Sequence, residues 1–186
     1  FEDALGPSHR DTLRTMIYLG DAALEIGEMD EADAHFEAAR SRAVRTLDIE
    51  GEIVLLADLG LASVAADRAE LDEAESRLED VIERAGRLLA PDDPAFERAV
   101  IRLTTVMGNQ GRYDEAASIL LDLVERRTAE LGVDHMKTIV ATQQLVGTWI
   151  LGGAVERAEP MARALVERRE AVSGEDHPGT INALRQ

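Results

Sequence analysis

The segment Gly111-Arg112-Tyr113-Asp114-Glu115-Ala116, GRYDEA, decides the fold because it carries the signals of a turn between two helices. Gly111 suits the left-handed backbone position that follows a helix. Asp114 is a residue type that caps helix N-termini. Apolar residues recur with helical spacing on both sides of the segment. The sequence therefore predicts a helical hairpin whose first helix ends at Gly111 and whose second helix runs to about Glu130.

The features of this hairpin recur every 42 residues along the chain. In five sets of equivalent residues, each member lies 42 residues after the one before it, and no insertion interrupts this spacing. They are Leu19, Leu61, Leu103 and Leu145; Gly27, Ala69, Gly111 and Gly153; Met29, Leu71, Tyr113 and Val155; Ala32, Ala74, Ala116 and Ala158; and Arg42, Arg84, Arg126 and Arg168. The sequence predicts one array over residues 1–186, with repeats at 5–46, 47–88, 89–130 and 131–172 and the start of a fifth at 173–186.

The composition favours an all-α fold. Hydrophobic residues make up 45% of the 186 residues, but aromatic residues only 3%. The core must therefore consist of Ala, Leu, Val and Ile, a mixture that suits close-packed helices better than a sheet.

Charge and composition also limit the functions to be considered. The formal net charge of −17 opposes contact with nucleic acid and with anionic membranes, since such contacts depend on basic patches. The absence of cysteine excludes disulfides and thiolate ligands. No apolar run approaches the roughly 20 residues of a membrane span, and no signal peptide is visible. We therefore expect a cytoplasmic protein, and the preference for Arg over Lys suggests a bacterial gene.

Two Asp-His pairs, at 134–135 and at 176–177, lie 42 residues apart. They could be metal ligands, a catalytic pair or helix boundaries. The equivalent loop at 91–94 lacks His, and the loop at 6–10 has Ser in place of Asp. Only helix-boundary chemistry is shared, so we expect Asp134 to start a helix and Asp176 or His177 to cap one.

The sequence shows no sign of catalysis. It has no phosphate-binding glycine loop, no nucleophile motif and no pair of His ligands at helical spacing. A zinc site needs three or four converging ligands, and the four histidines are scattered along the array. We therefore predict no enzyme activity, no catalytic or metal-binding residue and no cofactor.

The segments at 111–116 and 132–135 resemble the tetratricopeptide repeat in its 42-residue form, as found in kinesin light chains and in many bacterial proteins. The resemblance covers residues 5–186. It implies a right-handed superhelical solenoid of antiparallel helix pairs. It also implies that the first helices line a concave groove that holds a peptide or a helix of a partner protein.

The resemblance assigns the groove to one stripe of the first helices. Related repeats often place paired Asn there to clamp a peptide, and Gln143-Gln144 is the nearest substitute in this chain. Arg98 and Arg102 share a helical face and could anchor carboxylates of an acidic and apolar segment, or form salt bridges within the chain. The candidate groove residues are Arg14, Ile17, Tyr18, Leu59, Arg98, Ile101, Arg102, Gln143 and Gln144.

Two functions follow from the resemblance. The first is a scaffold that binds a partner protein or peptide in the groove. The alternative is a regulatory sensor that couples ligand or peptide binding to an attached effector domain. Residues 1–5 read as the tail of a preceding helix and residues 180–184 as the start of a following one. We therefore expect a piece of a longer protein, with self-association through the ends of the array as a further expectation.

Overall fold

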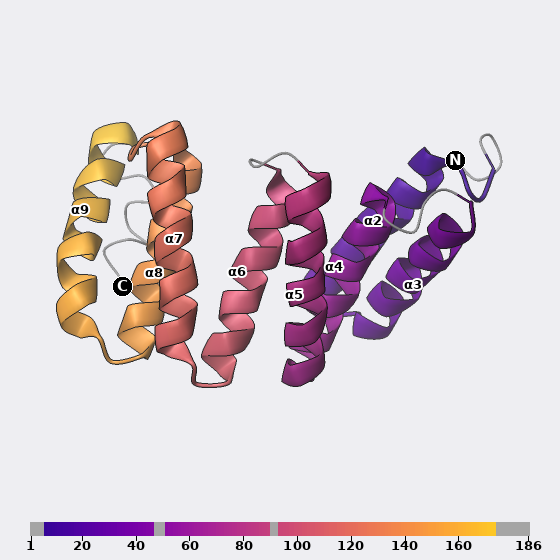
Figure 1. Ribbon diagram of the computed structural model, residues 1–186, viewed down its shortest axis with the longest axis horizontal. Helices are drawn as coiled ribbons and strands as arrows, with labels where there is room; N and C mark the ends of the chain where they lie inside the picture. The colour runs from indigo at the N-terminus through magenta and orange to yellow at the C-terminus, as the bar shows by residue number, and fades with distance from the viewer. Residues whose placement is uncertain (1–5, 47–50, 90–92, 174–186) are drawn as a thin grey trace. The chain divides into compact units, whose positions relative to one another are not determined.

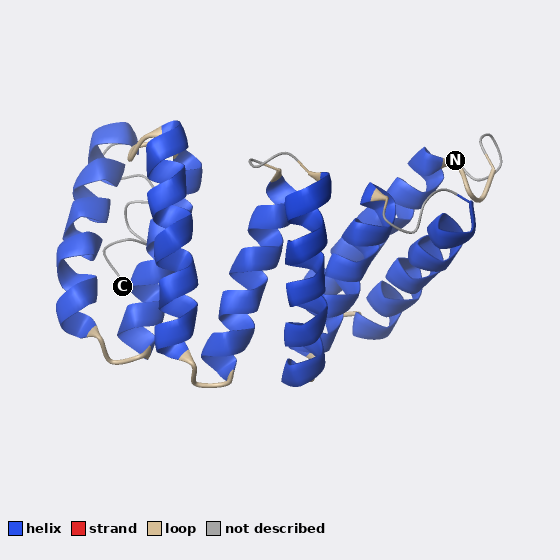
Figure 2. Cartoon of the chain, in the orientation of Figure 1, coloured by secondary structure: helices blue, strands red, loops and turns tan. Residues whose placement is uncertain are grey.

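The computed structural model describes residues 6–46, 51–89 and 93–173, which form eight α-helices (Figure 1) and contain no strand (Figure 2). The first helices of the pairs begin 42 residues apart, and so do the second helices. The prediction of an all-α chain of helix pairs is confirmed, whereas the exact repeat boundaries stay a prediction. The helices are α2 (Arg10–Glu25), α3 (Met29–Thr46), α4 (Glu52–Asp67), α5 (Leu71–Leu88), α6 (Pro94–Asn109), α7 (Tyr113–Leu131), α8 (Met136–Leu151) and α9 (Val155–Ser173).

The chain divides into two compact units, Phe1–Val106 and Met107–Gln186. In the first unit, α3 packs between α2 and α4, α4 also packs against α5, and α2 contacts α4 directly. In the second unit, α8 packs between α7 and α9. Within each unit, these helices therefore pack mainly against their neighbours in sequence, as an array of stacked hairpins requires.

The core of the first unit is built around Phe36 of α3, which is fully buried. Its ring lies against two glycines, Gly20 of α2 and Gly60 of α4. A Cβ atom added at Gly20 or Gly60 would come within 2.6 Å or 2.4 Å of the ring, so neither position has room for a side chain. The two glycines thus let both α2 and α4 approach the same aromatic ring closely.

The turns between the helices of each pair share one backbone conformation. The equivalent residues Gly27, Ala69, Gly111 and Gly153 all have positive φ, at 85°, 61°, 79° and 79°. In every turn this residue donates its N–H to the carbonyl three positions earlier, and the next residue donates to the carbonyl five positions earlier. This is the Schellman motif that ends helices. The positive φ predicted for Gly111 is confirmed, and Ala69 adopts it despite its Cβ atom.

Histidines cap two of the first helices. The Nδ1 atoms of His9 and His135 accept hydrogen bonds from the backbone N–H groups of Asp11 and Lys137, each at 3.2 Å. At the equivalent position before α6, the Asp93 carboxylate accepts from the Ala95 N–H at 2.8 Å. The interpretation of the Asp-His loop as a helix boundary therefore holds for residues 134–135.

The same loops carry a second repeated contact. The hydroxyl of Thr12 donates to the carbonyl of Gly6 at 2.9 Å, and Thr138 donates to Gly132 at 2.8 Å. Gly6 and Gly132 both have positive φ. A glycine, a histidine and a threonine at spacings of three residues thus form one loop structure at two places in the chain.

Two predicted caps were assigned to the wrong residue. Asp134 lies one residue before the actual cap, His135, because the imidazole reaches the N–H two positions ahead. Asp114 is the second residue of α7, whose cap position is held by Arg112 without a side-chain hydrogen bond. The third loop of this kind, at 174–180, lies outside the described residues.

An ion-pair cluster ties α3, α4 and α5 together around Asp58. Its carboxylate accepts from Arg40 and from Arg84, each at 2.6 Å, and Arg84 also binds Asp80 at 2.9 Å. Burial, the largest single influence, lowers the pKa of Arg84, but the hydrogen bonds to Asp58 and Asp80 and the negative charges of these carboxylates together raise the pKa above its ordinary value. Arg84 therefore acts as a buried structural cation.

We expect Gly60→Ala to destabilise the first unit, because the new Cβ atom would press on a buried ring that has nowhere to move. The free energy of unfolding from urea titration should fall by about 1–3 kcal/mol. Adding Phe36→Leu should recover part of the loss. The control Gly147→Ala meets no atom within 4 Å and should be neutral or stabilising by up to about 1 kcal/mol. A neutral Gly60→Ala variant would contradict the role given to this glycine.

The turns allow a matched pair of substitutions at exposed positions. Ala69→Gly should raise the free energy of unfolding by about 0.5–1 kcal/mol, because it removes the Cβ penalty at positive φ. Gly111→Ala should lower it by about 1–2 kcal/mol for the same reason. Thermal melting of both variants measures the difference, and equal melting temperatures would argue against the left-handed turn.

Removal of the shared carboxylate should be costly, since Asp58→Ala would leave the Arg84 guanidinium buried without its closest partner. We expect a loss of about 3–5 kcal/mol in urea denaturation. The comparison is Glu73→Ala, which breaks the exposed pair with Arg77 and should cost less than about 1 kcal/mol. Similar losses in both variants would show that burial of the Asp58 cluster does not matter.

Candidate functional site

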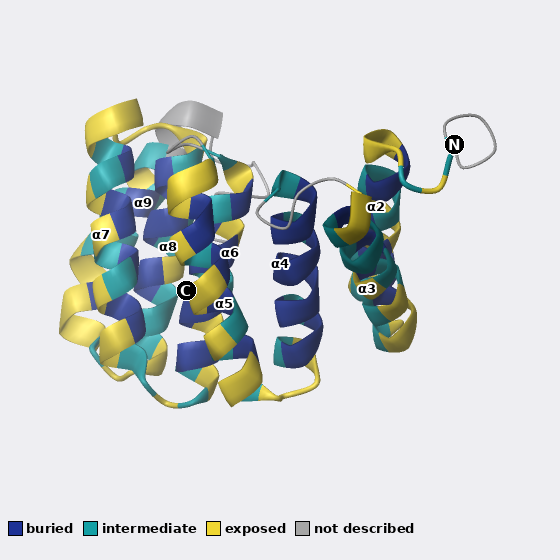
Figure 3. Cartoon of the chain, turned by 45° about the vertical axis from the view of Figure 1, so that its right-hand side comes forward, coloured by how far each residue is buried: buried dark blue, intermediate teal, exposed yellow. Residues whose placement is uncertain are grey.

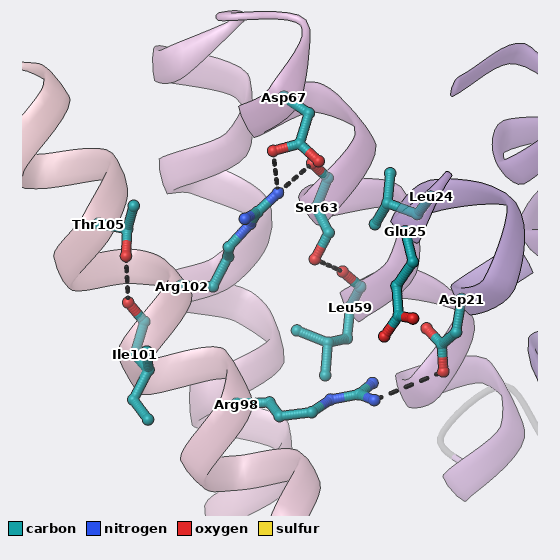
Figure 4. Close-up of a pocket in the computed structure, with 10 residues that line it drawn as sticks. All are labelled: Asp21, Leu24, Glu25, Leu59, Ser63, Asp67, Arg98, Ile101, Arg102 and Thr105. Carbon is teal, nitrogen blue, oxygen red and sulfur yellow. Dashed lines mark hydrogen bonds and ion pairs between the residues drawn. The ribbon is translucent and has the colours of Figure 1, made fainter. Parts of the chain in front are cut away.

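A groove of about 460 Å³ runs across the first helices of the first unit (Figure 4). Three successive first helices, α2, α4 and α6, supply its walls from equivalent positions of the repeat. Its floor is apolar and its edges are charged. The lining residues are Asp21, Leu24 and Glu25 of α2; Leu59, Ser63 and Asp67 of α4; and Arg98, Ile101, Arg102 and Thr105 of α6.

Both arginines of the groove have carboxylate partners within the chain. Arg102 of α6 binds the Asp67 carboxylate of α4 and also donates to the Ser63 carbonyl at 2.9 Å. Arg98 reaches across to Asp21 of α2, but the pair is 3.5 Å apart and the Arg98 side chain is 50% exposed. Arg102 is therefore held firmly between two helices, whereas the Arg98 pair is loose and open to solvent.

The acids of the groove outnumber its cations. Asp21, Glu25 and Asp67 face Arg98 and Arg102, so the groove carries a net formal charge of −1. Glu25 makes no hydrogen bond or ion pair with any residue that the structure describes. In Figure 4 its side chain points into the groove beside Asp21. The groove thus presents one free carboxylate next to a loosely held one.

The apolar part of the groove lies between these charges. Leu59 is almost fully buried at the base, and Leu24 and Ile101 are half-buried on either side of it. A side chain entering between Leu24 and Ile101 would lose contact with water and meet apolar surface. The groove can therefore accept one apolar side chain flanked by polar groups, an arrangement common in binding pockets.

The structure brings four of the nine predicted groove residues together and leaves five apart. Arg98, Ile101, Arg102 and Leu59 line the groove. The remaining five have other surroundings. Arg14 is paired with Glu52 at 2.6 Å; Ile17 is buried in the core beside Phe36; Tyr18 is exposed outside the groove; and Gln143 and Gln144 lie on α8 in the second unit.

Sequence reasoning missed the acidic side of the groove. Glu25 and Asp67 are equivalent residues, 42 positions apart, and neither is among the candidate groove residues named from the sequence. The repeat itself could have revealed this pair, because acids stand at the same position in two first helices. The contact between Arg98 and Asp21 joins the first repeat to the third and could not be read from the spacing of a single helix.

Other kinds of site find no support in the described part of the chain. No three His, Asp or Glu side chains there gather as a metal ion would require. Two of the histidines, His9 and His135, are occupied as helix caps. Among the same residues, no helix is long and apolar enough to cross a membrane.

Comparison with known proteins identifies the fold. A family model described as the tetratricopeptide repeat matches residues 59–95, 101–135 and 140–179, more than half of the chain. Among solved structures, the nearly identical TPR-like repeats of a proposed kinesin light chain of Podosopora anserina superpose with a TM-score of 0.74 at 19% identity, over 92% of this chain and 81% of that one. A variant of the same repeats with one residue substituted gives a TM-score of 0.76 at 19% identity, over 91% and 80% of the two chains.

A third solved structure has the same fold. BtubC (BKLC) from P. vanneervenii superposes with a TM-score of 0.74 at 18% identity, over 90% of this chain and 66% of that one. No curated protein matches the chain. The identities are low, so these structures establish the solenoid fold alone.

Tetratricopeptide repeats in general mediate contacts between proteins, and their fold is a scaffold without a catalytic centre of its own. The repeat spacing, the Schellman turns, the family match and the three structures agree with one another. The chain belongs to the tetratricopeptide repeat family.

Proposed function

We propose that the chain is a protein-interaction scaffold and that the groove between α2, α4 and α6 holds a segment of a partner protein. The observation that carries the proposal is the groove itself, an apolar floor with charged edges built from equivalent positions of three successive helices. Its volume falls in the range of binding pockets, which is about 300–1,000 Å³. A surface repeated along an array suits an extended or helical polypeptide.

The charges favour a partner segment that combines an apolar and a basic residue. A partner carboxylate would have to displace Asp21 from Arg98 and would add negative charge to a groove with three acids. A lysine or arginine would instead find the free Glu25 and the nearby Asp21. The overall charge of −17 also attracts a basic partner over longer distances.

Arg98 and Arg102 take different parts in this proposal. Arg102, bound to Ser63 and Asp67, keeps α6 at a set distance from α4 and so maintains the width of the groove. Arg98 lies at the open edge, where its loose pair with Asp21 can rearrange when a partner binds. The acidic and apolar partner considered from the sequence would need both arginines as anchors, and both are already engaged.

The partner class can be tested by selecting a displayed random-peptide library on the whole chain. We expect enriched peptides to place Lys or Arg next to an aliphatic or aromatic residue. Glu25→Lys should weaken their binding at least about tenfold, since it turns attraction into repulsion at the edge of the groove. The matched control is Glu79→Lys in the same unit, an exposed residue of α5 outside the groove, which should leave the affinity unchanged.

A second variant tests the groove independently of charge. Thr105 is exposed and lines the groove, so Thr105→Trp should fill the space and abolish binding without harming the core. Peptides that still bind Thr105→Trp at full strength would refute binding in the groove. If acidic peptides were enriched and no longer bound the Arg98→Glu variant, the groove would still be the binding site. The partner would then be acidic and not basic.

A further inference from the structure

Arg102 of α6 shows how a guanidinium group is bound between two first helices of this unit. Its Nη2 atom donates to the Asp67 carboxylate and, at 2.9 Å, to the carbonyl of Ser63, both on the preceding first helix α4. Asp67 lies about one helical turn after Ser63. The arginine of one repeat thus binds a carboxylate and a carbonyl that the repeat before it presents to the groove.

The equivalent positions on α2 are richer in acceptors. Glu25 stands 42 residues before Asp67, and Asp21 stands 42 residues before Ser63. Glu25 and Asp21 both line the groove. Because Ser63 is replaced by an aspartate, α2 presents two neighbouring carboxylates where α4 presents one. A guanidinium group placed here would therefore find more partners than Arg102 finds on α4.

The helix α4 cannot supply this guanidinium as α6 does. The residue of α4 equivalent to Arg102 is Gly60. The helix is buried along most of its length (Figure 3), and a Cβ atom at Gly60 would lie 2.4 Å from the Phe36 ring. Position 60 therefore has no room for an arginine. This explains why Glu25, unlike Asp67, makes no hydrogen bond or ion pair with any residue that the structure describes.

Arg98 of α6 fills this place only in part. Its Nη1 atom approaches the Asp21 carboxylate at 3.5 Å, and in Figure 4 its side chain extends past Leu59 toward α2. By contrast, Arg14 and Arg40 each hold a carboxylate of another helix at 2.6 Å. An exposed pair such as that of Arg98 shifts an equilibrium by up to about fivefold. A better-placed guanidinium can therefore displace Arg98 from Asp21.

The two carboxylates favour arginine over lysine as the cation that enters. A guanidinium group carries five N–H donors in a planar fork and can bond to two carboxylates at once, whereas an ammonium group is a compact, strongly hydrated charge. Figure 4 shows the side chains of Asp21 and Glu25 both turned into the groove. The chain already uses an arginine, Arg102, for the equivalent task on α4.

We propose that Glu25 and Asp21 form an arginine-binding site, in which an arginine of the partner takes the place on α2 that Arg102 takes on α4. This inference rests on the proposed function, since the arginine belongs to the segment held in the groove. Its guanidinium bonds to the Glu25 carboxylate and draws the Asp21 carboxylate away from Arg98. The apolar residue beside it enters the apolar part of the groove. Arginine, and not positive charge alone, is thus what the groove selects.

The probe is the most enriched peptide of the library selection, labelled with a fluorophore and made in three forms that differ only at the basic residue. The forms carry arginine, lysine, or citrulline, which has nearly the shape of arginine but no charge. In fluorescence anisotropy against the whole chain, the arginine form should bind at least about fivefold more tightly than the lysine form and about twentyfold more tightly than the citrulline form.

The outcomes separate this inference from the proposed function. Equal affinity of the arginine and lysine forms would overturn the arginine site and leave the proposed function standing. A selection that yields no peptide with a basic residue would also overturn the arginine site. A selection that yields no peptide bound in the groove would overturn both.

Removal of one carboxylate locates the site. Glu25→Gln should weaken binding of the arginine form at least about fivefold and remove its advantage over the lysine form, since the fork loses its main acceptor. The matched control Glu79→Gln removes the same charge from an exposed position of α5 outside the groove and should have no effect. Unchanged binding to Glu25→Gln would overturn the inference.

Removal of the competing cation gives a result that damage to the fold would not give. Arg98→Gln should tighten binding of the arginine form about three- to tenfold, and most of this gain should disappear when Asp21→Asn is added. The matched control Arg77→Gln, which breaks an exposed pair with Glu73 on α5, should leave the affinity unchanged. Unchanged or weaker binding to Arg98→Gln would overturn the inference.

Discussion

The structure depends on the turn that ends the first helix of each pair. A residue with positive φ ends α2, α4, α6 and α8 at the same position of the 42-residue repeat, and two backbone hydrogen bonds close each turn. Because the first helices have equal lengths, equivalent residues lie at the same distance from the helix ends. A stripe such as Asp21, Ser63 and Thr105 can then pass from helix to helix, which is the condition for a groove that crosses three of them. The backbone strain accepted at Ala69 shows that the array keeps this geometry even where the residue is unfavourable.

The functional features arise where the residues depart from the repeat. The position of Asp58 holds Met16, Val100 and Thr142 in the other repeats, so the carboxylate at the centre of this ion-pair cluster is not repeated. Arg102 stands where the preceding first helix has Gly60, and this change lets α6 bind back to Asp67 and Ser63. The backbone is repeated almost without change, whereas the charges and volumes on it differ from one repeat to the next.

The periodic features could be predicted from the sequence, and the contacts between repeats could not. Leu19 and its equivalents, the glycine turns and the boundary loops follow from local backbone chemistry, and they led to the correct class of fold. The pairing of Arg98 with Asp21 depends on how two repeats pack across a third, which no local signal encodes. The caps at His9 and His135 were missed because aspartate is the commoner capping residue. The imidazole Nδ1 performs the same task when the loop geometry brings it to the N–H two residues ahead.

The groove combines two kinds of interaction on neighbouring positions of its helices. The groove residues of α2 are Asp21, Leu24 and Glu25, of which two are acids, whereas Leu13 and Ile17 of the same helix are buried in the core. Charge governs the contact with a basic residue of the partner and should weaken as salt screens it, while burial of an apolar residue between Leu24 and Ile101 is little affected by salt. A single helix can therefore serve core packing and partner binding together, because successive positions around its axis face different neighbours.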